Sequence, residues 1–219
     1  MPMRARCILL LVLASVSIVA VGHAQAAAVG VLLGLSRDGA SGDSPPNTSY
    51  SGGFGLVTGL QAEIGLSQSM ALSIQPMFSQ HRTTITSATD DDASDEMTLD
   101  LKLDYISVPL VVKFSAAGGR TYVAGGVDLG FIQSARIAGD GIDEDIKDYF
   151  NSVDVGALFG FGVVFPLGRP SLTTELRYVQ GLTNLSNDTG TGVLATLPGR
   201  FHSGGFQLTA GILFPIGKK

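Results

Sequence analysis

The feature that most constrains this fold is a period-two alternation in which large hydrophobic residues are opposed by very small ones. Residues 153–165 show it clearly, with Phe159 and Phe161 on one side of the chain and Gly160 and Gly162 on the other. A repeat of two residues indicates β-strands that have one apolar face.

The same alternation recurs along the chain and defines eight expected strands. Their ranges are 28–36, 54–66, 70–81, 98–114, 121–133, 153–165, 171–181 and 204–214. In residues 98–114 the apolar set changes phase between Leu103 and Ile106. This change predicts either a β-bulge or an end of the membrane-buried stretch.

Two kinds of β-protein could show this pattern. A soluble sandwich or lipocalin-like barrel would turn its apolar face inward, and its other face would be rich in Lys, Glu, Thr and Gln. Here that other face is mostly Gly, Ala and Ser, which suit the narrow interior of an eight-stranded barrel. The Val, Leu and Phe face then meets lipid.

Composition favours the membrane-spanning form. Hydrophobic residues make up 45% of the chain and charged residues only 15%, against a usual value of about 25% charged. Beyond residue 26 no run of the roughly 20 apolar residues that a membrane-spanning helix needs is present. We therefore predict an all-β, eight-stranded antiparallel up-and-down transmembrane β-barrel; a soluble exported lipid-binding β-barrel is the alternative.

The connections alternate in length and charge. Four are long, at 37–53, 82–98, 136–150 and 183–203, and three are short, at 67–69, 115–120 and 166–170. Acidic residues gather in the long connections, whereas the short ones and the C-terminus carry basic residues. Long outer loops and short inner turns are typical of outer-membrane barrels.

The N-terminus has the pattern of an export signal. Arg4 and Arg6 precede an apolar run from Cys7 to Val21, and small residues stand at Ala24 and Ala26. We expect residues 1–26 to be a cleaved signal peptide and residues 27–219 to form one barrel domain. No cysteine remains after residue 26, so the expected domain holds no disulfide or thiolate metal site. No basic, aromatic-rich surface for nucleic acid is indicated.

Several of these segments resemble the PorT-like outer-membrane β-barrel family. The resemblance is carried by residues 71–80, 103–114, 121–131 and 175–185, of which LDYISVPLVVKF (103–114) and TYVAGGVDLGF (121–131) look like the core motifs of the family. It implies an eight-stranded barrel in the envelope of a Bacteroidetes-like bacterium, in a family some of whose members serve protein secretion. The chain departs from the family at Met77, where an acidic residue is common. It also has no Trp and does not end in an aromatic residue.

Six charged residues fall on the small-residue face and are expected inside the barrel. They are Glu63, Lys113, Asp128, Asp154, Glu175 and Arg177. Charges in a narrow interior must be paired, so we expect a plug of ion pairs and hydrogen bonds. A proton or ion path is the alternative, although eight strands leave little open lumen.

The acidic connections offer candidate ligands for a divalent cation, and a few serine and histidine residues are candidates for catalytic groups. The candidate metal ligands are Asp90, Asp91, Asp92, Asp143 and Asp145. Such a site would bridge to lipopolysaccharide phosphates; a solvated acidic loop is the simpler interpretation. Ser79, His81, His202 and Ser203 show no hydrolase spacing, so no enzyme activity and no cofactor are expected.

The sequence thus predicts a non-enzymatic protein of the bacterial outer membrane that acts through acidic extracellular loops. Its expected partners are outer-membrane lipid or lipopolysaccharide, and an envelope or extracellular protein. A narrow transport barrel or a protein-secretion accessory barrel is the alternative.

Overall fold

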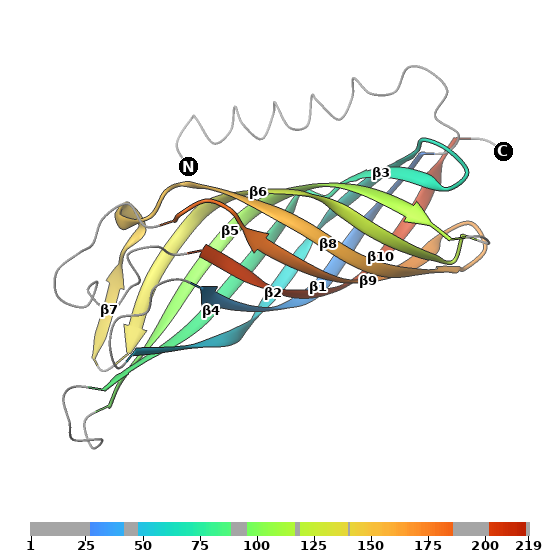
Figure 1. Ribbon diagram of the computed structural model, residues 1–219. Coiled ribbons are helices and arrows are strands. Elements are labelled where there is room, and N and C mark those ends of the chain that lie inside the picture. The colour runs from blue at the N-terminus through green and yellow to red at the C-terminus, as the bar shows by residue number, and fades with distance from the viewer. Residues whose placement is uncertain are drawn as a thin grey trace.

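The computed structural model describes residues 27–41, 48–88, 96–116, 119–139, 141–185 and 202–217. They form ten strands and one short 3-10 helix, η1 (Figure 1). The elements are β1 (Ala27–Ser41), β2 (Thr48–Gly65), β3 (Met70–Ile74), β4 (Met77–Ala88), β5 (Glu96–Ser115), β6 (Thr121–Gly139), β7 (Ile142–Asp145), η1 (Lys147–Tyr149), β8 (Val153–Pro166), β9 (Ser171–Gly181) and β10 (His202–Ile216).

The strands close into an antiparallel ring. Neighbouring strands of the ring are antiparallel, and β1 pairs with β10 from Ala27 opposite Ile216 onward, which closes the barrel. β3 and β4 act as one strand that is interrupted at Gln75 and Pro76, because β3 and β4 each pair with β2 on one side and with β5 on the other. If β3 and β4 are counted as one strand, the ring therefore has eight strands, as the sequence predicts. β7 is a short additional strand that pairs with β6.

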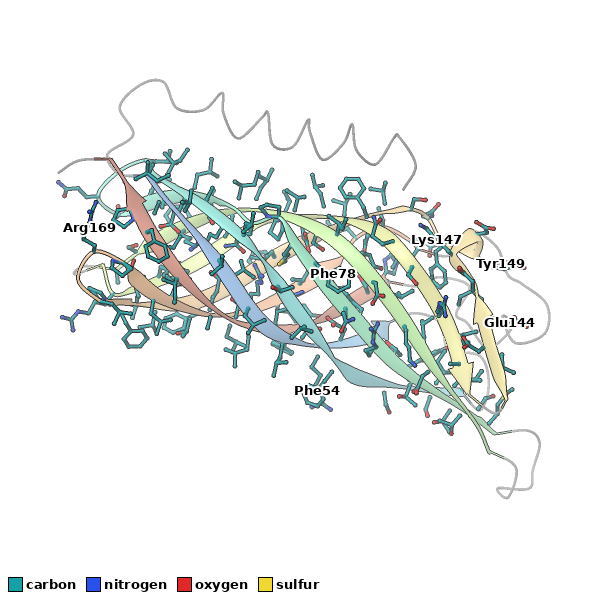
Figure 2. All side chains as sticks on the ribbon, turned by 180° about the vertical axis from the view of Figure 1, so that it is seen from behind. Phe54, Phe78, Glu144, Lys147, Tyr149 and Arg169 are labelled. Atoms are coloured by element: carbon teal, nitrogen blue, oxygen red, sulfur yellow. The ribbon has the colours of Figure 1, made fainter. Side chains whose placement is uncertain are left out.

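The large hydrophobic residues cover the outside of this ring. Val127 is 43% exposed and Phe159 is 67% exposed, whereas Thr173 on the opposite face is buried. Figure 2 shows side chains projecting outward around the barrel wall, with Phe54 and Phe78 among them. A ring without free strand edges pairs its backbone groups internally, which is what a lipid environment demands. Among the described residues, no helix is long and apolar enough to span a membrane.

The two ends of the barrel differ. Short connections at 66–69, 116–120 and 167–170 lie at the same end as Ala27 and Ile216, and we call this the turn end. At the other end, the loop end, the strands are joined by the longer connections, and β7 and η1 lie there (Figure 1).

The predicted loop bounds were wrong at this end. β1 continues to Ser41, β4 to Ala88, and β5 begins at Glu96, so most of 82–98 is a strand hairpin. The predicted loop 136–150 contains the end of β6, β7 and η1. Apolar alternation does not indicate these extensions, because their outward positions are polar.

The phase change in β5 reflects the end of the lipid-facing stretch. Odd-numbered residues of β5 are buried on both sides of the change, from Leu99 through Tyr105 to Lys113. The odd-numbered side chains of β5 therefore point into the barrel along the whole strand. What changes is their character: near the loop end the inward side chains are apolar and the outward ones polar, whereas further along the outward ones are apolar. A register shift does occur between Asp104 and Tyr105, but its extra residue, Gln133, lies in β6.

At the loop end the barrel consequently has an apolar filling. The buried residues of this cluster, which we call the apolar plug, are Ile85, Leu99, Leu101, Leu103, Tyr105, Ile132, Ala135, Ile137, Ile146, Phe150 and Leu185.

Candidate functional site

The barrel interior below the apolar plug holds all six charged residues that the sequence places there. Lys113, Asp128, Asp154, Glu175 and Arg177 are buried, and the Glu63 side chain is 24% exposed. They separate into two groups: Arg177, Glu175, Lys113 and Glu63 form a linked network, and Asp128 and Asp154 line a small cavity nearer the plug.

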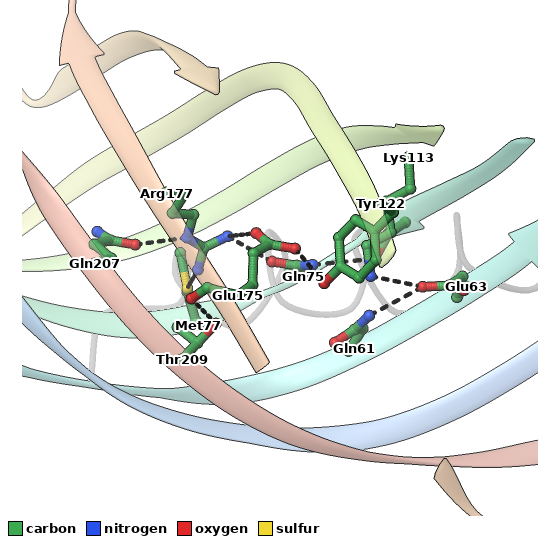
Figure 3. Close-up of polar contacts among 11 residues, drawn as sticks. Gln61, Glu63, Gln75, Met77, Lys113, Tyr122, Glu175, Arg177, Gln207 and Thr209 are labelled. Atoms are coloured by element: carbon green, nitrogen blue, oxygen red, sulfur yellow. Dashed lines mark hydrogen bonds and ion pairs between the residues drawn. The ribbon is translucent and has the colours of Figure 1, made fainter. Parts of the chain in front are cut away.

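Arg177 is the centre of the network, and its side chain is fully buried. Its Nε donates to Gln207 Oε1 at 2.9 Å and its Nη1 donates to Gln75 Oε1 at 2.7 Å. The guanidinium also lies 3.7 Å from Glu175 Oε1 and 3.4 Å from Met77 Sδ (Figure 3). A guanidinium presents donors in a fixed fork, so one side chain can join strands on opposite sides of a narrow barrel.

A second ion pair continues the network toward the turn end. Lys113 Nζ lies 2.8 Å from Glu63 Oε2, which also accepts a hydrogen bond from Gln61. The Lys113 ammonium sits 4.7 Å from the centre of the Tyr122 ring. The Tyr122 hydroxyl donates to Glu175 Oε2 at 2.8 Å, which connects the two ion pairs (Figure 3).

Glycine on the inner face makes room for this network. Gly162 lies directly across from Tyr122 in the β6–β8 pairing. A Cβ at residue 162 would overlap the Tyr122 ring, so only glycine permits the ring to lie there. The small-residue face is thus a consequence of how tightly polar side chains fill the interior.

Between the network and the plug lies a small polar cavity of about 20 Å³, enough for about one water molecule. Its lining includes His81, Tyr105, Asp128, Asp154 and Ser203. Asp154 is satisfied, since it accepts hydrogen bonds from Thr183 and from Ser203 at 2.7 Å. Within the described part of the chain, neither Asp128 Oδ1 nor the Tyr105 hydroxyl has a hydrogen-bond partner.

The structure also brings together three residues that the sequence did not connect. Ser79 Oγ lies 3.3 Å from His81 Nε2, and His81 Nδ1 lies 3.3 Å from Asp38 Oδ1. Ser79 and His81 share a strand face, which the two-residue spacing could have indicated. Asp38 comes from β1, and no sequence signal pointed to its contact with β4.

This Ser-His-Asp arrangement lacks the other requirements of a hydrolase. Ser79 is fully buried, and its hydroxyl also lies 3.4 Å from Ser107 Oγ. An acyl-transfer site must bring its substrate to the nucleophile, whereas the Ser79 side chain lies inside the closed ring with no exposed surface. The geometry therefore fits a buried polar contact better than a nucleophile.

The remaining candidate residues are Asp90, Asp91, Asp92, Asp143, Asp145 and His202. Asp143 and Asp145 lie in the exposed strand β7, and Asp90, Asp91 and Asp92 lie outside the described residues. Over the described ranges, no group of three or more His, Cys, Asp or Glu side chains is arranged to hold a metal ion. His202 and Ser203 open β10, and only Ser203 joins the cavity.

A closed ring with a lipid-facing outer belt and a polar interior defines an integral membrane β-barrel. Residues 23–187 match the family described as outer membrane protein beta-barrel domain. The chain belongs to this family and is a protein of the bacterial outer membrane. Among curated proteins, none has significant sequence similarity to this chain.

Solved structures of other small barrels are similar to this one. Neisserial surface protein A (NspA) is 14% identical with a TM-score of 0.47, over 85% of this chain and 97% of that one. Ail of Yersinia pestis is 15% identical with a TM-score of 0.44, over 85% and 98%. OprG from Pseudomonas aeruginosa is 9% identical with a TM-score of 0.49, over 88% and 96%. At these values the similarities carry no functional argument.

Proposed function

We propose that this protein is a non-conducting, non-enzymatic outer-membrane barrel that holds a folded interaction surface outside the membrane. The observation that carries the proposal is the loop-end extension, where β4, β5 and β6 continue beyond the lipid-facing residues around the apolar plug. Short turns face the periplasm in outer-membrane barrels, so the loop end is taken to be extracellular.

The extension is built as a rigid surface. Its outward residues are polar, for example Thr84, Asp100 and Lys102, and its inward residues Leu99 and Leu101 are about 1% exposed. A segment with its own buried apolar side chains keeps a fixed shape, unlike a loop that has little to bury. A fixed polar surface suits recognition of outer-membrane lipid or lipopolysaccharide, or of an envelope or extracellular protein.

Two layers of side chains argue against a transport role. The network around Arg177 fills the centre of the barrel, and the apolar plug fills its loop end. An ion that crossed this barrel would have to pass both a paired charge cluster and a dry apolar layer. The full burial of Ser79 argues against hydrolysis, because a substrate could not reach its hydroxyl.

We further propose that the chain belongs to the PorT-like subgroup. The support is the resemblance of residues 71–80, 103–114 and 121–131, which lie in β3 to β6, and of residues 175–185, which include the end of β9 (Ser171–Gly181). This assignment concerns relationship and leaves the interaction role unchanged.

The test is single-channel recording in planar lipid bilayers with the purified, folded protein. We expect no discrete conductance steps, because the lumen is filled. A variant with Leu101 and Leu103 both replaced by Gly tests whether the plug contributes to closure. Reproducible steps from the unmodified protein would overturn the non-conducting assignment.

A further inference from the structure

Three basic side chains stand in lateral register on the outer face of the loop-end extension. Arg82 of β4 lies directly opposite Lys102 of β5, and Lys102 lies directly opposite Arg136 of β6. Side chains directly opposite each other on neighbouring strands are about 4.5–5.5 Å apart at their Cβ atoms, and like charges in such pairs are destabilising. We call these three residues the basic row.

The basic row lies just beyond the lipid-facing surface. The last outward hydrophobic residues of the three strands are Phe78, Ile106 and Phe131, which are themselves in register. Arg82 and Lys102 follow four residues further along their strands, about 13 Å at the usual rise or about 10 Å of height at a 40° tilt. Because the headgroup region extends about 5–7 Å beyond the hydrocarbon core on each side, the row stands at its outer edge, and long Arg and Lys side chains can reach back to the headgroups.

The charges of the row are only partly compensated within the described chain. Arg82 Nη1 lies 3.0 Å from Asp104 Oδ1, and Asp100 accepts a hydrogen bond from Thr84. Lys102 and Arg136 are exposed, and no described acidic group lies within ion-pair distance of either. Asp145 is the cross-strand neighbour of Arg136, but it accepts from the Lys147 backbone.

Basic residues elsewhere follow a different pattern. Lys113 and Arg177 are inside the barrel, Arg120 and Arg169 lie in turns at the turn end, and the exposed Arg37 of β1 lies over the Phe54 ring. Figure 2 shows Arg169 and Lys147 at opposite ends of the barrel. In a chain with a net charge of −5, a row of three adjacent cations within reach of the headgroups therefore indicates an anionic partner.

We propose that the basic row binds the phosphate groups of the phosphorylated glycolipid of the outer leaflet. Arg82 and Arg136 can each present two parallel N–H donors to a phosphate, and Lys102 between them supplies a point charge. The anion removes the repulsion within the row. This proposal rests on the extracellular position of the loop end, and it names the lipid partner of the proposed interaction surface.

The experiment compares the unmodified protein with a Lys102→Gln, Arg136→Gln variant in detergent micelles. The measured quantity is the temperature at which the band of folded protein is lost on a denaturing gel. This band is recognised because folded protein migrates differently from protein unfolded by heat. Bisphosphorylated lipid A and dephosphorylated lipid A are added in matched series. The control variant is Arg120→Gln, Arg169→Gln, which removes two charges at the turn end.

We expect two opposite effects. Without glycolipid, the row variant is as stable as the unmodified protein or more stable, because repulsion between cations has been removed. With bisphosphorylated lipid A, the unmodified and control proteins gain stability. The row variant needs at least about tenfold more lipid for the same gain, as expected when hydrogen bonds to a charged group are lost. Dephosphorylated lipid A acts equally on all three.

Three results would overturn the proposal. A row variant that responds to bisphosphorylated lipid A as strongly as the unmodified protein does would show that the row does not recognise phosphate. A loss of stability of the row variant without lipid would show that the cations are paired within the chain itself. Full competition by millimolar inorganic phosphate would assign a free-anion site in place of a lipid site. None of these results bears on conductance, so the non-conducting role is tested separately.

Discussion

At the scale of single residues, Arg177 is central to the interior network, because its guanidinium reaches Gln75, Gln207 and Glu175 from one position. Replacing it with Met would leave the buried Glu175 carboxylate without its cation. We expect the Arg177→Met variant to lose about 3–5 kcal/mol of unfolding free energy, the usual cost of breaking a buried ion pair on one side. Urea titration of the protein in lipid vesicles measures it.

The matched control is the double variant Arg177→Met, Glu175→Gln, which removes both charges. It should recover part of the loss, because a neutral amide is cheaper to bury than an unpaired carboxylate. A single variant as stable as the unmodified protein would show that the ion pair is not needed to hold the interior together.

The outward residues permit a comparison between lipid and water on the same surface. Val127 and Thr98 both point outward, but only Val127 lies within the apolar belt. Arg in place of Val127 should cost about 2–4 kcal/mol if the side chain meets lipid near the midplane. Arg in place of Thr98 should change the free energy of unfolding by less than about 0.5 kcal/mol, as at ordinary surface positions. Equal costs in the same vesicle assay would contradict the assigned position of the lipid belt.

At the scale of elements, the β4–β5 hairpin is the part whose order depends on the apolar plug. Leu101→Asp would place an unpaired carboxylate among Ile85, Leu99 and Ile137. We expect this variant to become sensitive to protease added to intact cells, with cuts in residues 83–101, while the membrane part stays folded. Thr98→Asp, on the exposed face of the same strand, is the control and should remain resistant. Cleavage of neither variant would show that the plug does not determine the order of the hairpin.

How far the sequence could predict these elements follows from what period two encodes. Alternation is a local property of the sequence, so it predicts the eight strands of the ring and the outward orientation of Val127 and Phe159. Alternation does not say whether the apolar face of a strand points outward or into the barrel. Leu99, Leu101 and Leu103 have the same period as Ile106 and Val108, but they face inward. Distinguishing the two sets requires knowing where the membrane ends, which is a property of the assembled ring.

The interior site was predictable only as a set of residues. Lys113 and Arg177 stand out because charges are rare on a face of glycine, alanine and serine. Their partners depend on the register across several strands, and Gln75, Gln207 and Tyr122 were not singled out. The contact between Asp38 and His81 joins β1 to β4 across the inside of the ring, and no spacing along the chain encodes it.

For the whole molecule, the remaining question is the direction in which the barrel crosses the membrane, and single cysteines can settle it. Residues 27–219 contain no cysteine, so each introduced thiol would be the only one in that part of the chain. Asp100→Cys tests the loop end, Arg120→Cys tests the turn end and Val127→Cys tests the lipid belt; residues 100 and 120 are both exposed. With a membrane-impermeant maleimide on intact cells, we expect labelling at 100 alone, because only the loop end lies outside. After the outer membrane is permeabilised, residue 120 should also react. Residue 127 should stay unlabelled throughout, since a thiol in hydrocarbon is neither hydrated nor readily ionised.

Labelling of residue 120 but not of residue 100 on intact cells would invert the barrel and place the basic row on the periplasmic side. Because the basic row would then face the inner leaflet, that result would also withdraw the glycolipid assignment while leaving the closed, filled barrel as described.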